Sequence, residues 1–251
     1  MGFNEGFLNE DRLMYCIDGK KFDQLNGNLQ HFISLILPYL DKEKPIKCCK
    51  AEPYTKPDIC IYQGNQRVFV SVKHGTTEIL HDEKINPFIN FLREQGIDED
   101  IINGYLLYHY GDGTTDGTGE TRLAAFDARV KYDEEVRKVN EAFNKSKDFI
   151  KEFADRVMFK GVNPDAETAD VLYHGDEDYG SFISRNQLMR HLERRSYDFM
   201  TQNVHIGPFI VRPRARYPGK EIKNDDHRHK IVVSYPRLLN EVMYISGRYK
   251  F

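Results

Sequence analysis

The strongest local pattern in this chain is an alternation of apolar and polar positions between residues 56 and 75. Ile59 and Ile61 alternate with shorter or polar neighbours, and beyond Gly64 and Asn65 the alternation resumes at Val68, Val70 and Val72. Period-two apolar runs on either side of a Gly-Asn pair predict a β-hairpin, and glycine at the first central position suits a type II′ turn.

The predicted turn sets the register of the two strands. With Gly64-Asn65 as a two-residue loop, paired positions sum to 129, so Asp58 lies opposite Ser71. Lys73 follows one step further on the same face, because strand side chains alternate between the two faces. Pro57 stands at the start of the strand, where its missing N–H is best tolerated. We therefore expect Asp58, Ser71 and Lys73 to converge at one end of the hairpin.

An aspartate beside a lysine on adjacent strands indicates a particular chemistry when another carboxylate lies nearby. Mg²⁺ prefers hard oxygen ligands, keeps several waters, and is held by one or two carboxylates together with a substrate phosphate. A lysine can position the attacking water or stabilise the charge that develops on the phosphate. These groups are the minimum for metal-dependent phosphodiester cleavage. The simpler interpretation is that Lys73 is an ordinary edge-strand lysine.

The two half-motifs Pro57-Asp58 and Ser71-Val72-Lys73 resemble those of the PD-(D/E)xK superfamily of metal-dependent nucleases. The resemblance covers roughly positions 27–110. It implies that Asp58 and Lys73 are catalytic and that Asp58 binds Mg²⁺, with Mn²⁺ as a substitute. The family's usual second acid falls at Ser71, which cannot replace a charged carboxylate but can hydrogen-bond a metal-bound water. Some restriction endonucleases of this superfamily with an SVK-type strand take the missing acid from the following helix.

The segment after the hairpin offers such an acid. A helix is predicted over 84–95 from apolar residues at helical spacing, which are Ile85, Phe88, Ile89 and Leu92. Because Pro87 must lie in the first turn, Glu83 falls near the helix N-terminus, where an ionised carboxylate is favoured. We therefore predict Glu83 as the second catalytic acid and metal ligand.

Other residues are held in reserve for the same site. Glu78 is the alternative acid, whereas Asp82 points about a quarter-turn away if the helix has already begun. His81 stands two residues before Glu83 and is a supporting candidate. Glu52 follows the first predicted strand and is a further supporting candidate, although a surface glutamate is the simpler interpretation.

The order of predicted elements gives the fold class. A helix over 27–40, a strand over 46–51, the hairpin, the helix over 84–95 and a strand over 105–110 form the order α-β-β-β-α-β. This order resembles the restriction-endonuclease-like core, so we expect an α/β protein with an α+β mixed sheet. A helical insertion is expected over 122–158, a strand pair near 171–174 and 180–183, a helix near 185–195, and mostly strands over 203–251.

The predicted order of elements divides the chain into three consecutive segments. Residues 1–120 are expected to form the nuclease core, 121–200 a helical and β insertion packed on the core, and 201–251 a basic β-rich C-terminal portion. One continuous domain is the alternative. Residues 181–251 carry 14 Lys and Arg against 6 Asp and Glu, although the whole chain has a net charge of −3. Local basic surface attracts phosphate backbones, but it also attracts the acidic remainder of the same chain.

Two further segments are candidates for DNA contacts. Residues 111–119 are glycine-dense and polar, which predicts a structured loop in which Thr114 and Thr115 contact the DNA backbone. Asp112 or Asp116 would add acidity to the site, and a plain tight loop is the simpler alternative. The basic, aromatic segment 212–217 supplies side chains to phosphates or guanine edges, from Arg212, Arg214 and Arg216.

Composition narrows the class of protein. The chain has 251 residues, of which 40% are hydrophobic and 30% charged, as in globular proteins with a substantial core. No apolar run approaches the length that spans a bilayer, and the first residues lack the plan of a signal peptide. The four cysteines fit no zinc spacing. These features predict reduced thiols, a cytoplasmic location and no membrane partner, and the family resemblance implies that the cytoplasm is bacterial.

The sequence therefore predicts a Mg²⁺-dependent endonuclease that cuts double-stranded DNA, with a homodimer presenting two sites to a palindrome. The resemblance favours a bacterial type II-like restriction or phage-defence enzyme. Because Ser71 departs from the motif, the alternative is a catalytically inert nucleic-acid-binding or defence module on a nuclease scaffold. An RNase or a nickase with the same metal chemistry is the third possibility.

Overall fold

The protein folds into two compact units in a computed structural model that describes residues 5–74, 79–119, 121–163, 165–197, 203–214 and 226–245. Unit 1 contains residues 1–78, 154–191 and 237–251, and unit 2 contains residues 79–153 and 192–236. The chain therefore passes between the units at positions other than 120 and 200, and neither unit is one continuous segment. Both units combine helices with a sheet, as expected for an α/β protein of mixed type.

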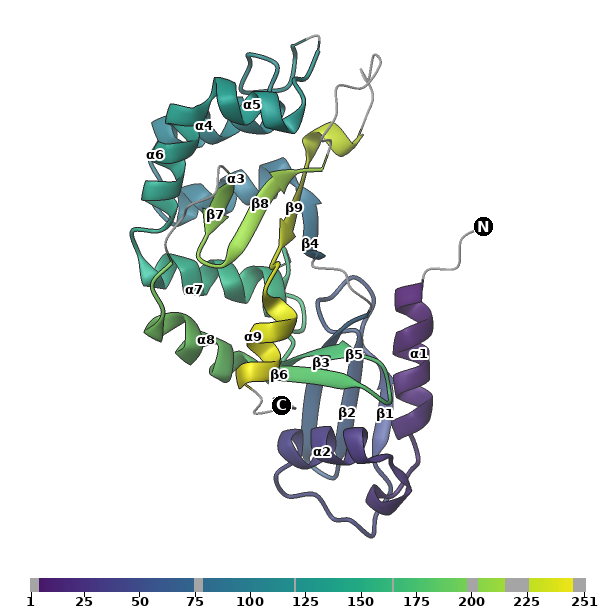
Figure 1. The fold of residues 1–251 in the computed structure, drawn as a ribbon. Coiled ribbons are helices and arrows are strands. Elements are labelled where there is room, and N and C mark those ends of the chain that lie inside the picture. The colour runs from purple at the N-terminus through teal and green to yellow at the C-terminus, as the bar shows by residue number, and fades with distance from the viewer. Residues whose placement is uncertain are drawn as a thin grey trace. The chain divides into compact units, whose positions relative to one another are not determined.

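Unit 1 is built on a five-stranded mixed sheet (Figure 1). Its strand order is β1-β2-β3-β5-β6. Neighbouring strands are antiparallel except β3 and β5, which are parallel. The strands are β1 (Lys47–Lys50), β2 (Ile59–Gln63), β3 (Gln66–Lys73), β5 (Val171–Gly175) and β6 (Gly180–Ser184).

The predicted hairpin is confirmed, with its register. Ile59 pairs with Val70 and Gln63 pairs with Gln66, so paired positions sum to 129. Gly64 has a φ of 58°. Asn65 is not among the residues with positive φ, so only the first central residue takes a left-handed φ, as a type II′ turn requires. The paired register ends at Ile59 and Val70, so Asp58 lies one residue before β2.

Helices cover one face of this sheet. The helix α1 (Glu5–Ile17), a 3₁₀ turn (Phe22–Gln24) and the helix α2 (Gly27–Ile36) lie beside the strands (Figure 1). Their apolar side chains form one buried cluster with alternate strand residues, which include Ile59, Ile61, Val70, Val72, Val171, Tyr173 and Phe182. The helix predicted over 27–40 starts as expected, because the Asn26 side chain accepts a hydrogen bond from the Leu29 amide. It ends at Ile36 because Pro38 disfavours a helical conformation at Leu37.

Unit 2 is built on a four-stranded antiparallel sheet with the order β4-β9-β8-β7. The strands are β4 (Ile79–Lys84), β7 (Val204–Ile206), β8 (Phe209–Pro213) and β9 (Lys230–Ser234). The helices of this unit are α3 (Ile85–Glu94), α4 (Glu99–Tyr110), α5 (Ala125–Lys131) and α6 (Asp133–Phe143), and α7 (Lys147–Asp155) ends just beyond it. A π-helical turn (Arg156–Lys160), α8 (Arg185–Arg194), a 3₁₀ turn (Asp226–His229) and α9 (Leu238–Ile245) complete the described elements.

The helix α6 protects the edge strand β7 through two asparagines one turn apart. Asn140 accepts a hydrogen bond from the His205 amide at 2.7 Å, and its own amide donates to the Asn203 carbonyl at 2.9 Å. Asn144 donates to the His205 carbonyl at 2.9 Å and accepts from the Gly207 amide at 2.6 Å. These side chains satisfy backbone groups that an exposed edge strand would present to another chain.

Several sequence-based predictions about secondary structure hold. The helices predicted over 84–95 and 185–195 are α3 and α8, and the strand pair near 171–174 and 180–183 is β5 and β6. The helical insertion over 122–158 corresponds to α5, α6 and α7.

The strand predicted over 105–110 is wrong, because these residues form the second half of α4. Ile102, Tyr105 and His109 are all buried at helical spacing, and Gly111 ends the helix with a φ of 60°. The expectation of mostly strands over 203–251 holds for β7, β8 and β9, but Asp226–His229 form a 3₁₀ turn and Leu238–Ile245 form the helix α9.

Unit 1 keeps the first part of the predicted order α-β-β-β-α-β, whereas the predicted second helix and last strand are not in this unit. The helix α2 and the strands β1, β2 and β3 are followed by the π-helical turn at 156–160 and then by β5, which pairs in parallel with β3. The helix over 84–95 and the residues 105–110 belong to unit 2 instead. The residues of unit 2 from 79 to 153 are thus inserted between β3 and β5.

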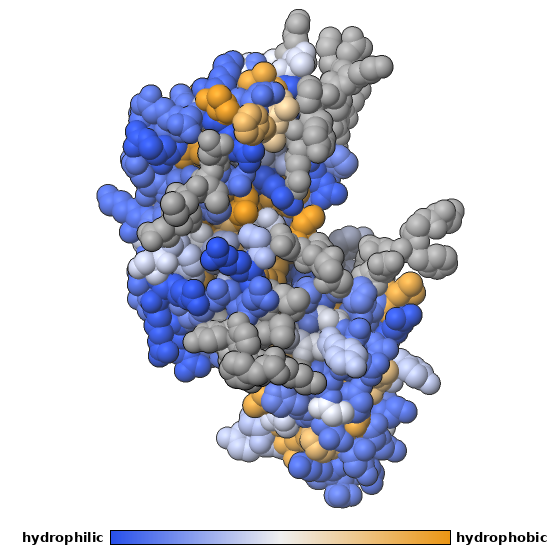
Figure 2. Space-filling model, viewed as in Figure 1, coloured by the Kyte–Doolittle hydropathy of each residue, from blue (hydrophilic) through white to orange (hydrophobic). Residues whose placement is uncertain are grey.

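The surface is mostly hydrophilic on the face shown in Figure 2. An apolar patch lies over α5, which exposes Phe126 and Val130 by 60% and 57%. Within the described ranges, every helix is too short or too polar to cross a membrane.

Candidate functional site

The end of the hairpin brings Asp58 against β3. Its backbone amide donates to the Val70 carbonyl at 2.9 Å, and because Val70 also pairs with Ile59, both residues lie against Val70 and the regular register does not continue to Asp58. Its carboxylate oxygen Oδ2 accepts a hydrogen bond from the Val72 amide at 2.6 Å and another from Ser71 Oγ at 3.3 Å. The predicted convergence of Asp58 and Ser71 is therefore present.

Lys73 lies one same-face step beyond Ser71 at the end of β3. Val70 and Val72 point into the buried cluster with α1 and α2, so Ser71 and Lys73 point to the opposite face. Ser71 is fully buried, whereas Lys73 is half-buried. No hydrogen bond or ion pair to a described residue engages the Lys73 ammonium. Lys73 stands at the end of β3, a central strand of the sheet.

The two carboxylate oxygens of Asp58 differ in their contacts. Both of its hydrogen bonds fall on Oδ2, so Oδ1 is left without a hydrogen bond from a described residue. A carboxylate oxygen is the hard ligand that Mg²⁺ prefers, and Mg²⁺ can be held by one protein carboxylate, waters and a substrate phosphate. The donor set at Asp58 therefore fits a Mg²⁺ ion that relies on the substrate for further ligands.

Glu83 lies close to the start of α3, as predicted, but on a strand and in the other unit from Asp58. It lies on β4, opposite Ile231 of β9 and one residue before the N-cap Lys84 of α3. Its side chain is 3% exposed, and Oε1 lies 3.2 Å from His81 Nε2. Glu83 and His81 belong to the sheet of unit 2, whereas Asp58 and Lys73 belong to the sheet of unit 1. Glu83 and Asp58 therefore do not belong to the same sheet. Glu83 is a residue of the strand β4 and not of the helix α3.

The other reserve acids do not complete the hairpin site. Glu52 is exposed in the loop after β1, and its backbone carbonyl accepts a hydrogen bond from Thr55 Oγ1 at 2.7 Å. Glu78 lies outside the described residues. Across the described part of the chain, no three or more His, Cys, Asp or Glu side chains gather closely enough to hold a metal ion. A cluster in which Asp58 and a second acid join a third metal ligand is thus not found among the described residues.

The pairing of β3 with β5 brings in one residue that the sequence analysis missed. Lys73 pairs with His174, which pairs in turn with Ser181 on β6. His174 closes a short apolar strand, and no motif marks it. Only the parallel pairing of two strands far apart in the chain could reveal this neighbour of Lys73.

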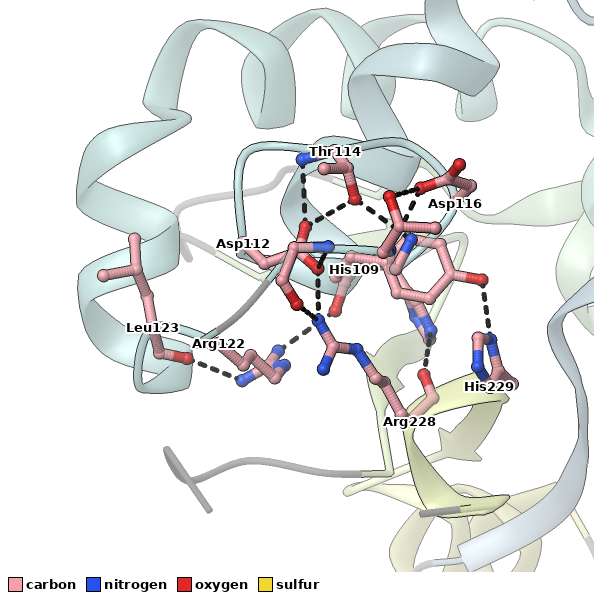
Figure 3. Close-up of polar contacts among 12 residues, drawn as sticks. His109, Asp112, Thr114, Asp116, Arg122, Leu123, Arg228 and His229 are labelled. Atoms are coloured by element: carbon pink, nitrogen blue, oxygen red, sulfur yellow. Dashed lines mark hydrogen bonds and ion pairs between the residues drawn. The ribbon is translucent and has the colours of Figure 1, made fainter. Parts of the chain in front are cut away.

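A second polar cluster forms in unit 2 around the loop 111–119 (Figure 3). The Asp112 side chain is fully buried and accepts hydrogen bonds from the Thr114 amide at 2.9 Å, from Thr114 Oγ1 at 2.8 Å and from the Gly119 amide at 3.1 Å. Arg228 Nη2 donates to the same carboxylate and, at 2.7 Å, to the Gly119 carbonyl. Burial opposes ionisation of Asp112, but the hydrogen bonds from Thr114 and Arg228 outweigh it and lower its pKa.

The same cluster ties α4 to the start of β9. His109 Nε2 lies 3.1 Å from the Arg228 carbonyl, and Tyr110 Oη lies 3.1 Å from His229 Nδ1 (Figure 3). Arg122 Nη2 donates to the His109 carbonyl at 3.2 Å, and burial lowers the pKa of the Arg122 guanidinium. Together with the Asp112–Arg228 ion pair, these contacts connect α4 and the loop 111–119 to the turn before β9; we call this set of contacts the clasp.

This arrangement changes the roles predicted for the loop. Asp112 is bound to Arg228, and Asp116 accepts hydrogen bonds from Thr118 at 3.0 and 2.7 Å, so both carboxylates serve the loop itself. Thr114 Oγ1 donates to Asp112 and accepts from the Gly117 amide at 3.0 Å. Of the two predicted phosphate contacts, Thr115 is the exposed one.

The basic segment after β8 is described only in part. Arg212 is half-buried on β8, and Arg214 forms an ion pair with Asp82 of β4. Arg216 lies outside the described residues. Arg214 is therefore already neutralised by a carboxylate, which weakens the case for it as a DNA contact.

Acid is expected to destabilise unit 2, because burial lowers the pKa of His109 to about 3 and that of His205 to about 4. In the unfolded chain both histidines bind protons near pH 6.5. The unfolded state therefore binds more protons below that pH, and stability falls as pH falls from 6.5 towards 4. Between pH 7 and 5 each histidine should lower the free energy of unfolding by about 2 kcal/mol.

Urea denaturation followed by circular dichroism at the two pH values measures this effect. His205→Gln should remove about half of the difference. His227→Gln is the control, because His227 is exposed and should leave the difference unchanged. Equal stability of the wild type at both pH values would contradict the assignment of neutral, buried histidines.

Comparison with known proteins adds no family assignment: neither the protein-family models nor the curated proteins searched contain a match to this chain.

Proposed function

We propose that this protein is a Mg²⁺-dependent DNA endonuclease of the PD-(D/E)xK type with a restriction-endonuclease-like core. The observation that carries the proposal is the contact at the end of the β2–β3 hairpin, where Ser71 Oγ donates to the Asp58 carboxylate at 3.3 Å and Lys73 lies one same-face step beyond Ser71. The order α2-β1-β2-β3, a helical turn, and β5 parallel to β3 supports the same core. A basic C-terminal region, with 14 basic against 6 acidic residues over 181–251, supports a nucleic-acid substrate.

The residues of the site have distinct tasks under this proposal. Mg²⁺, when bound at Asp58, supplies charge stabilisation to the phosphate and lowers the pKa of a bound water. Ser71 Oγ and the Val72 amide hold Oδ2 of Asp58, which leaves Oδ1 as the oxygen for the metal. The Lys73 ammonium stabilises the negative charge that grows on the phosphate oxygens. We propose a bacterial restriction or phage-defence role, with Mn²⁺ as an effective substitute.

A homodimer is the assembly that this function favours. Cutting both strands of a palindrome requires two sites related by a two-fold axis. The exposed Phe126 and Val130 on α5 offer apolar surface for such contact within the helical insertion.

One observation favours a second candidate function, which is a catalytically inert nucleic-acid-binding module. Ser71 occupies the position of the family's second acid, is fully buried, and donates to Asp58. A serine in this place reinforces the hairpin without adding a metal ligand.

Digestion of a supercoiled plasmid separates these candidates. Wild type with Mg²⁺ or Mn²⁺ should linearise the plasmid, EDTA should prevent cutting, and Lys73→Met should reduce the rate by about 100-fold. Lys47→Met is the matched control, because Lys47 is an exposed lysine on β1 of the same sheet. If DNA is bound but is not cut with either metal, the protein is the inert binding module and not an endonuclease. Nicked circles alone, or cleavage of RNA only, would indicate the nickase or the RNase.

A further inference from the structure

A polar row crosses three strands of the unit 1 sheet beside the proposed site. Lys73 at the end of β3 pairs with His174 on β5, and His174 pairs with Ser181 on β6. Directly paired residues on neighbouring strands share a face and lie within reach of one another. The row is therefore continuous from Lys73 to Ser181.

The side chains of this row point to the face that carries Asp58. Their immediate neighbours Val72, Tyr173 and Phe182 are members of the buried cluster with α1 and α2. Because side chains alternate along a strand, Lys73, His174 and Ser181 point away from that cluster. Ser71, which donates to Asp58, lies on the same face as Lys73.

On the face of the sheet that carries Ser71 and Lys73, the residues change from apolar to polar between two successive rows. In the row of Ser71, the paired residues Leu172 and Ile183 are 1% and 0% exposed, so apolar packing covers that part of the face. In the next row the two corresponding positions are His174 and Ser181, which are each 7% exposed, and Lys73 is half-buried. The apolar cover thus gives way to polar groups at the same end of the sheet as Asp58.

The backbone around His174 is held firmly. The Gly175 carbonyl accepts a hydrogen bond from Asn9 Nδ2 at 2.8 Å, and Tyr173 Oη donates to the Asp176 carbonyl at 2.5 Å. Gly180 has no room for a side chain, because an added Cβ would lie 1.9 Å from Tyr173 Oη. Groups on fixed strands hold their positions more accurately than groups on loops, which is what recognition of a small anion requires.

We propose that His174 is a phosphate-contacting residue of the site and acts beside Lys73. A ring N–H of His174 and the Lys73 ammonium donate hydrogen bonds to oxygens of the same phosphodiester. This inference rests on the proposed function for its substrate class and extends it by naming a second donor. The site lacks the second acid of the family at position 71, and Lys73 and His174 provide hydrogen-bond donors beside it. Phosphate binding through these two donors should therefore not depend on the metal.

The test measures binding and cleavage separately. Binding of a short duplex DNA is measured by fluorescence anisotropy in EDTA, and cleavage is measured with Mg²⁺. His174→Leu should weaken binding in EDTA by about ten- to a hundred-fold, as for the loss of a hydrogen bond to a charged group. His174→Gln keeps an N–H donor and should bind more nearly like wild type. His31→Gln is the control, because His31 is an exposed histidine against Phe182 on the other face of the sheet.

A second measurement keeps the test decisive if His174→Leu folds poorly. The ring signals of His174, assigned in nuclear magnetic resonance spectra through His174→Gln, should shift when inorganic phosphate is added in EDTA. The His31 ring signals should stay in place. A purely structural His174 would change stability without shifting these signals.

The outcomes distinguish this inference from the proposed function. If wild type cuts DNA, and both the affinity of folded His174→Leu and the His174 signals are unaffected, the inference fails and the endonuclease stands. If wild type binds but does not cut, and His174→Leu weakens binding, the inference stands and the endonuclease fails. Wild type that neither binds nor cuts DNA, with His174 signals that ignore phosphate, overturns both.

Discussion

Replacing Asp58 by asparagine is expected to reduce Mg²⁺-dependent DNA cleavage by about 100- to 1,000-fold. Asparagine retains a side-chain oxygen that can accept the hydrogen bonds from the Val72 amide and from Ser71 Oγ. It loses the negative charge that a hard divalent cation requires. The substitution therefore separates the structural role of the residue from its chemical role.

Initial rates of plasmid cleavage at saturating Mg²⁺ measure this effect, with thermal unfolding followed by circular dichroism as the check on folding. Asp58→Ala should lose activity and also stability, because the buried Val72 amide is left without its acceptor. Asp23→Asn is the matched control in the same unit, since Asp23 is exposed in the short helical turn before α2. A folded Asp58→Asn that cuts at the wild-type rate would remove Asp58 from the site.

Replacing Asp112 by alanine is expected to lower the free energy of unfolding by about 3–5 kcal/mol. The Asp112 side chain is fully buried and that of Arg228 is 12% exposed, so the variant leaves a nearly buried guanidinium without its counter-charge. It also removes the acceptor of the Thr114 and Gly119 amides. The Gly119 carbonyl remains as a partner of Arg228, at 2.7 Å, and does not supply a negative charge.

Chemical denaturation followed by circular dichroism is suited to this test, since the chain has no tryptophan. Asp116→Ala is the matched control in the same loop, because that carboxylate is exposed and has no ion pair with a described residue; its cost should stay below about 1 kcal/mol. The double variant Asp112→Ala with Arg228→Met should recover part of the loss, because the unpaired charge is gone. A loss for Asp112→Ala no larger than for Asp116→Ala would show that the clasp contributes little.

Local patterns predicted the hairpin well, because the signals that define it act over short distances. The alternation around Gly64 and Asn65 specifies both strands, and a two-residue turn leaves one register in which the apolar residues face a core. Helices such as α3 were also predictable from apolar residues at helical spacing.

The same reasoning failed where local patterns conflict or are weak. Residues 105–110 are rich in aromatic and apolar residues, and a short run of this kind fits a strand as well as a buried helix. The strand β4 contains His81, Asp82, Glu83 and Lys84 and lacks a plain alternation. It is a strand because it pairs with β9, which lies far away in the chain.

The sequence by itself determined the half of the site that is local. Asp58, Ser71 and Lys73 are placed by one turn and by the alternation of side chains, and both follow from neighbouring residues. Tertiary structure alone decided the rest: His174 stands beside Lys73, Glu83 belongs to the sheet of unit 2, and Asp112 binds Arg228. The physical reason is that strand pairing and buried ion pairs between distant segments depend on how the whole chain packs, and no local pattern encodes them.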